Sequence, residues 1–157
     1  MPVDRELQSS MFQRIFSYDK HLKNSTRIVV LVVATSPGSS DAQKMAAAFR
    51  EQGMFPAIVT VEGLTDDLTA TLTPQSTVMY LMPEIDYTSA GNFAAQKGFL
   101  SISGLPALAA SGHVSVSVDR MSGRDDGRAQ IVVNIPRLNA EGHKLSVELL
   151  RLAHIIR

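Results

Sequence analysis

A serine-rich turn at residues 35–40, Thr-Ser-Pro-Gly-Ser-Ser, is the stretch best suited to binding chemistry. It follows a β-branched run and precedes a helical segment, where free amides and a helix dipole favour anions. It lacks the lysine of G-x-x-x-x-G-K-[ST] and the glycines of G-x-G-x-x-G, and Asp41 would repel a phosphate. Ordinary helix capping is the competing interpretation. The residues that would line a ligand crevice here are Ser36, Ser39, Ser40 and, from a later strand end, Ser103.

Side chains that could hold a metal or act as nucleophiles form no matching motif. The four histidines stand at no i,i+4 spacing and have no carboxylate motif beside them. Ser101 and Ser103 resemble a nucleophile elbow, but G-x-S-x-G is matched in no frame. The acidic pairs at 66–67 and 125–126 lie in polar segments, where a carboxylate keeps its normal acidity. The sequence therefore predicts no catalysis, no metal and no cofactor.

Two features could bind a partner protein. The polar loop at residues 119–128 contains three acids and three arginines, Arg120, Arg124 and Arg128, and arginine is favoured at interfaces. Phe12 and Phe16 stand one helical turn apart, and an exposed aromatic pair would mark a binding patch. The competing interpretations are a long mobile hairpin loop for the arginines and core packing for the aromatic pair.

The composition limits the class of protein. Fifteen basic and fifteen acidic residues cancel without long blocks, so the footprint of a nucleic-acid binder is missing. The absence of cysteine excludes disulfides and thiolate chemistry. The longest apolar run, residues 28–34, is far short of the roughly 20 residues that a membrane helix needs. Balanced charge leaves a homodimer open.

The elements that must position these residues begin with a helix over residues 4–20. Its apolar face would be formed by Leu7, Met11, Ile15, Tyr18 and Leu22. Residues 26–35 are rich in β-branched residues without alternation, which predicts a central strand buried on both faces. Ser40 and Gln43 form a capping box for a helix that ends at Gly53.

Strands and helices then alternate. Strands are predicted at 56–61, 78–82 and 99–103, with a short helix within 63–76, a helix over 89–97 and a helical turn over 106–110. Residues 113–118 alternate at period two and can pair with residues 130–135, before a final helix over 145–156. The expected fold is one α/β domain over residues 1–157, Rossmann- or flavodoxin-like. Its mostly parallel sheet has helices on both faces and is closed by an antiparallel hairpin and the final helix.

Three segments carry a resemblance to a known family: residues 11–22, the strand and turn over 99–104, and the tail over 134–156. The tail combines a strand ending in Val-Asn-Ile, an Asn-Ala turn of helix, and Leu-Ser-x-x-Leu-Leu-x-Leu-Ala-x-Ile-Ile. This order resembles the carboxyl end of the YfiR-like family of small exported bacterial proteins. The resemblance implies a non-enzymatic periplasmic regulator that binds and represses a membrane-bound diguanylate cyclase, in cyclic-di-GMP signalling and biofilm control.

The chain departs from the family pattern in three ways. It has no cysteine for disulfide control, a single Gly112 where relatives often have a glycine pair, and no leader at residues 1–6. The expected location is the periplasm, with a leader removed, and the alternative is the cytoplasm. The alternative function is a small-ligand sensor, whose crevice would be lined at the strand carboxyl ends by residues 36–40, 83–87 and 103–106.

Overall fold

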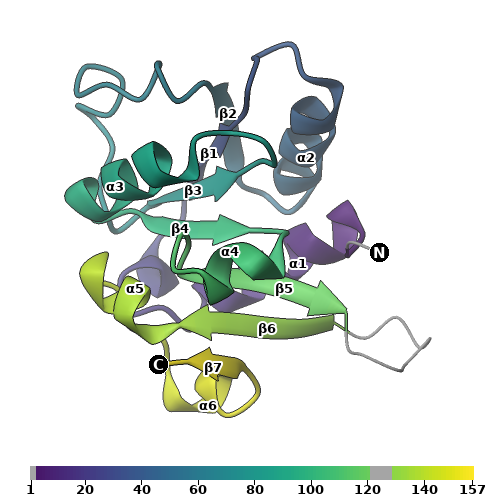
Figure 1. Cartoon of the computed structure of the whole chain (residues 1–157), viewed down its shortest axis with the longest axis vertical. Coiled ribbons are helices and arrows are strands. Elements are labelled where there is room, and N and C mark those ends of the chain that lie inside the picture. The colour runs from purple at the N-terminus through teal and green to yellow at the C-terminus, as the bar shows by residue number, and fades with distance from the viewer. Residues whose placement is uncertain (1–2, 121–128) are drawn as a thin grey trace.

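The computed structural model describes residues 3–120 and 129–157. These residues form an α/β fold built on a single seven-stranded sheet. The strand order is β2-β1-β3-β4-β5-β6-β7, and Figure 1 shows the strands fanning from β2 at the top to β7 at the bottom. The strands are β1 (Val29–Val33), β2 (Phe55–Val59), β3 (Thr77–Leu81), β4 (Leu100–Ser103), β5 (Val116–Arg120), β6 (Ala129–Asn134) and β7 (His154–Ile156).

The predicted mostly parallel sheet with one antiparallel pair is confirmed. All neighbouring strands are parallel except β5 and β6, which pair antiparallel with Val116 opposite Val133. The β-branched run forms β1 and is buried on both faces as predicted, but β1 is second from the edge and not central. The edge strand β2 carries Pro56, which has no N–H to offer a further strand.

Helices cover both faces of the sheet, as predicted. The helical elements are α1 (Arg5–Phe16), η1 (Leu22–Asn24), α2 (Ser40–Glu51), α3 (Tyr87–Lys97), α4 (Pro106–Ala110), α5 (Ile135–Ala140) and α6 (Val147–Leu150). One core cluster joins α1 and α2 to side chains such as Val30 and Val78. A second cluster joins α3 and α4 to the alternate side chains, such as Leu31 and Met79, so the pleat divides the core in two.

The order of strands reverses once. The chain passes from β1 to β2 on one side and then to β3 on the other side of β1. Helix α2 makes the first crossing, and its N-cap is Ser39, whose side chain accepts a hydrogen bond from the Ala42 amide, one residue before the predicted cap. Gly53 ends the helix region with a φ of 83°, as predicted. Open α/β sheets bind ligands at such reversals.

The predicted short helix between β2 and β3 is wrong. The chain forms turns there, and Leu68 is 41% exposed, so the leucines that suggested the helix, Leu64, Leu68 and Leu72, share no buried face. The Thr65 hydroxyl accepts a hydrogen bond from the Leu68 amide, and the Thr69 hydroxyl donates to the Thr65 carbonyl. These local bonds compete with helix formation.

The predicted final helix is only one turn long. Ser146 caps α6 by accepting a hydrogen bond from the Leu149 amide, but the helix ends at Leu150. Leu152, which lies within the predicted helix, is 76% exposed. Residues 154–156 instead form β7, because their β-branched isoleucines pair with the otherwise open edge of β6.

The first helix is shorter than predicted and its buried face is rotated. The predicted face includes Leu7 and Tyr18, which are 37% and 40% exposed. The side chains that α1 buries are instead Gln8, Ser9, Phe12, Ile15 and Phe16. The wrong face was predicted because two residues of the buried face, Gln8 and Ser9, are polar. The apolar period alone does not reveal that a glutamine has a buried hydrogen-bond partner.

Candidate functional site

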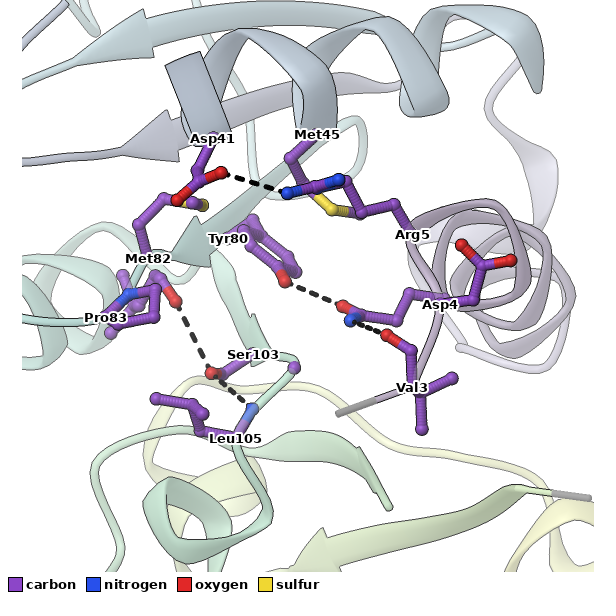
Figure 2. A pocket seen from close by; sticks show the side chains of 13 residues that line it. Val3, Asp4, Arg5, Asp41, Met45, Tyr80, Met82, Pro83, Ser103 and Leu105 are labelled. Carbon is purple, nitrogen blue, oxygen red and sulfur yellow. Dashed lines mark hydrogen bonds and ion pairs between the residues drawn. The ribbon is translucent and has the colours of Figure 1, made fainter. Parts of the chain in front are cut away.

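A crevice opens where the carboxyl ends of β3 and β4 meet the amino ends of α1 and α2. Its volume is about 350 Å³. Figure 2 shows side chains from these four elements pointing into one hollow. The crevice lies beside the reversal between β1 and β3, on the side that the topology predicts for a ligand. We call the crevice and its lining residues the β3–β4 crevice; these residues are Val3, Asp4, Arg5, Gln8, Asp41, Met45, Tyr80, Leu81, Met82, Pro83, Ser103, Gly104 and Leu105.

One wall is a buried relay of hydrogen bonds. The Tyr80 hydroxyl donates to Gln8 Oε1 over 2.7 Å, and Gln8 Nε2 donates to the carbonyl of Val3 over 2.7 Å. Both side chains are 5% exposed. Burial raises the pKa of Tyr80 far above its usual value, so the phenol keeps its proton and remains a donor at neutral pH. The relay fixes the start of α1 against the end of β3.

Gly104 allows this wall to pack tightly. A Cβ built at Gly104 would lie 2.5 Å from Gln8 Oε1 and 2.8 Å from the Tyr80 hydroxyl oxygen. Either distance is below normal contact, so a side chain here would push apart the relay. Ser103, the preceding residue, accepts a hydrogen bond from the Leu105 amide and donates to the carbonyl of Leu81. These contacts hold the β4 end in a fixed turn.

The rim of the crevice is charged. Arg5 Nη2 of α1 lies 3.0 Å from Asp41 Oδ1 of α2, and these side chains are 42% and 71% exposed. Asp4, the N-cap residue of α1, is also exposed. Interaction with the neighbouring Glu6 side chain lowers the pKa of Asp4, so Asp4 is ionised at neutral pH. The rim thus presents one guanidinium and two carboxylates.

The remaining surface is apolar, and it defines what the crevice can do. Met45 is buried, and Met82 and Leu105 are half-buried. Among the described residues that line the crevice, none is His, Cys or Lys. A charged rim over an apolar floor can bind and orient an amphipathic small molecule.

Of the four predicted crevice residues, the structure brings one to the crevice. Ser103 lines it, whereas the serines of the 35–40 turn do not. The Ser36 hydroxyl accepts a hydrogen bond from the Gly38 amide, Ser39 caps α2, and Ser40 is the first residue of α2. Capping, the competing interpretation, is what these contacts show.

Of the predicted partner-binding residues, Phe12 and Phe16 are buried. Phe12 and Phe16 are 0% and 1% exposed, so they form no exposed patch. Their rings stack at 6.3 Å in the core beneath α1. Arg120 is the last residue of β5, and Arg124 and Arg128 lie outside the described residues.

Sequence reasoning missed Gln8, Tyr80 and Gly104 at the crevice, and it missed a second buried polar cluster. The Glu141 carboxylate is fully buried and accepts hydrogen bonds from Ser101 Oγ, Ser115 Oγ and Arg137 Nε. Ser101 is therefore a partner of a buried carboxylate and not an exposed nucleophile. The one available signal was Gln8, a polar residue spaced i,i+4 and i,i+7 from Phe12 and Ile15.

The histidines occupy different surroundings. His21 and His143 pack edge to face at 5.2 Å, and His113 Nδ1 lies 2.7 Å from Ser111 Oγ. In residues 3–120 and 129–157, no group of three or more histidines and carboxylates is arranged as a metal site. Over the same residues, no helix has the length and apolar character needed to cross a membrane.

Comparison with known proteins supports the fold class. No protein-family model matches the chain, and no curated protein matches it. Among solved structures, a similar chain is the ABC domain in complex with L-Trp from Streptococcus pneumonia, with a TM-score of 0.66 and 9% sequence identity. The match covers 97% of this chain, which spans 60% of the length of that chain. At this identity, the likeness shows a shared α/β fold.

Proposed function

We propose that this chain is a small-ligand-binding domain whose binding site is the β3–β4 crevice. The observation that carries the proposal is a hollow of about 350 Å³ at the strand carboxyl ends, beside the reversal of strand order. Its volume is at the lower end of the range for small-molecule sites. The similar ABC domain is described in complex with L-Trp, which is consistent with ligand binding on this fold.

A thermal-shift screen of free amino acids, anions, nucleotides and amphiphiles tests the proposal. A ligand that binds only the folded state raises Tm, and the shift grows with the logarithm of its concentration above Kd. Leu105→Trp narrows the crevice and should abolish the shift. Leu68→Trp is the matched control, because Leu68 is 41% exposed and lies outside the crevice. A flat profile across the whole panel would contradict the proposal.

Regulation of a membrane-bound diguanylate cyclase is the second candidate and remains a prediction from the family resemblance. The observation that favours a protein partner is an apolar groove beside α6 and β7, which we call the C-terminal groove. It is lined by Ile135, Val147, Leu150, Arg151, Ile155 and Arg157. Val147 is 62% exposed. Apolar surface beside two guanidinium groups suits a partner with apolar and acidic side chains.

Site-specific photocrosslinking in cells tests this second candidate. A crosslinking residue at Val147 should capture a membrane diguanylate cyclase, identified by mass spectrometry. The same residue at Leu68, exposed on another part of the molecule, serves as the control. Equal recovery from both positions, or recovery of no cyclase, would reject this function for the C-terminal groove.

A further inference from the structure

Resting on the proposed function, we infer that the β3–β4 crevice takes a zwitterion: a free amino acid with an apolar side chain. The feature that points to this class is the juxtaposition of one guanidinium, two carboxylates and an apolar floor in a single small hollow. The hollow of about 350 Å³ limits the ligand to a small molecule.

The first step concerns the ion pair on the rim. Arg5 and Asp41 belong to different helices and meet across the mouth of the crevice, as Figure 2 shows. Because both side chains are substantially exposed, water screens their attraction, and the ion pair contributes little to the stability of the fold. An entering ligand can therefore separate Arg5 from Asp41 at small cost.

The second step concerns the charge of that ligand. A simple carboxylate could pair with Arg5 but would face the carboxylates of Asp4 and Asp41. A simple amine could displace Arg5 from Asp41 but would then leave Arg5 without its partner. A zwitterion supplies a carboxylate to the guanidinium of Arg5 and an ammonium to the carboxylate of Asp41, so both members of the separated pair keep an opposite charge.

The third step concerns the apolar side chain of the ligand. Met45, Met82 and Leu105 offer thioether and aliphatic surface below the rim. The nearby polar groups of Tyr80 and Gln8 are already satisfied by each other and by the Val3 carbonyl. They therefore require no hydrogen bond from the ligand, and a hydrocarbon or thioether side chain can lie against this wall without leaving a polar group unpaired.

Calorimetric titration of the whole chain tests the ligand class. The standard free amino acids are titrated first, followed by two relatives of the tightest binder, one lacking its carboxylate and one lacking its amine. For leucine, these would be isopentylamine and 4-methylpentanoic acid. We expect each relative to bind at least about tenfold more weakly, the loss expected for a charged hydrogen-bonding group.

Two substitutions test which rim residue binds the carboxylate of the ligand and which binds its ammonium group. Arg5→Gln should weaken binding of the amino acid and of the carboxylic acid about tenfold without weakening the amine, and Asp41→Asn should weaken binding of the amino acid and of the amine. Arg14→Gln and Asp67→Asn are matched controls on exposed residues outside the crevice. Both controls should bind the amino acid as the unaltered chain does.

The outcomes separate the two proposals. An amine that binds as tightly as its amino acid, or a bound anion or nucleotide with no bound amino acid, overturns the zwitterion and leaves a ligand-binding domain. Absence of binding across amino acids and the wider panel overturns both. Amino-acid binding that is insensitive to Leu105→Trp and Arg5→Gln places the ligand elsewhere and overturns the inference.

Discussion

His143 Nδ1 lies 2.8 Å from Asp19 Oδ2, although the two residues are 124 positions apart in the chain. His143 Nε2 lies 2.7 Å from the carbonyl oxygen of Gly98, which can only accept, so this nitrogen carries a proton. The Asp19 carboxylate also accepts hydrogen bonds from the amides of His21 and Leu22. This set of contacts favours an imidazolium paired with a carboxylate, both with fully buried side chains.

This pair predicts how stability depends on pH. Burial raises the pKa of Asp19, but the hydrogen bond and charge of His143 outweigh it, so the pKa lies below 3.8. Burial lowers the pKa of His143, but Asp19 outweighs it, so the pKa lies above 6.5. Stability from Asp19 is lost as pH falls through its lowered pKa, and stability from His143 is lost as pH rises through its raised pKa. The free energy of unfolding, measured by chemical denaturation, should therefore be highest between the pKa of Asp19 and the pKa of His143.

Removing the histidine should destabilise the fold and should also reduce the decline of stability above neutral pH. His143→Gln leaves the carboxylate of Asp19 buried without its counter-ion, and we expect a loss of about 3–5 kcal/mol in the free energy of unfolding. His154→Gln is the control, because His154 is exposed. An unchanged decline of stability above neutral pH in His143→Gln would contradict the assignment of that decline to this pair.

Glu141→Gln should be the most damaging acid-to-amide change away from Asp19. Its two oxygens accept from Ser115 Oγ and from Arg137 Nε, at 2.5 and 2.9 Å, and a glutamine amide would turn its nitrogen toward one of these donors. We expect a loss of about 3–5 kcal/mol by urea denaturation. Glu148→Gln, at an exposed position of α6, should change stability by about 0.5 kcal/mol. Similar losses for both would mean that the buried cluster contributes little.

Gly104→Ala should loosen the crevice wall. The new methyl group would lie 2.5 Å from Gln8 Oε1, so the relay from Tyr80 through Gln8 must shift, at a cost of about 1–3 kcal/mol. Ligand affinity should fall with it. Gly38→Ala is the matched control, since its nearest neighbour would be Ser36 Oγ at 3.7 Å. Thermal unfolding and titration of both variants give the comparison, and an unaffected Gly104→Ala would show that the wall is adaptable.

Phe12→Ala and Leu7→Ala test which face of α1 is buried. Phe12 is 0% exposed and its ring packs near those of Phe49 and Tyr80, at 6.4 and 6.1 Å. Its loss should cost about 3–5 kcal/mol. Leu7, on the predicted but more exposed face, should cost about 0.5 kcal/mol. Equal losses in denaturation midpoints would support the face expected from the apolar period.

The sequence was most informative where local chemistry determines structure. The β-branched run gave β1, Gly53 ended a helix, and Pro106 opened α4 at the predicted residue. The sequence was misleading where a partner distant in the chain determines whether a residue is buried. Gln8 is buried because Tyr80, 72 positions away, donates to it, and no spacing within α1 reveals that partner.

The same limit explains the missed tail and most of the missed site. Residues 154–156 form a strand because β6 leaves an edge open, a property of the assembled sheet and not of the tail. The topology did predict that a crevice would lie at the strand carboxyl ends, and Ser103 was found there. Its charged rim could not be predicted, because Arg5 and Asp41 meet only after two helices have packed.

From β3 to β7, the order of strands across the sheet is also their order along the chain. During synthesis from the amino end, each new strand can therefore join an edge that the ribosome has already released. Asp19 is made early, but its partner His143 emerges only after β6, so its carboxylate stays hydrated until then. Closure of this ion pair is thus a late event in biogenesis, and nascent chains shorter than 143 residues should expose the end of α1 to proteases.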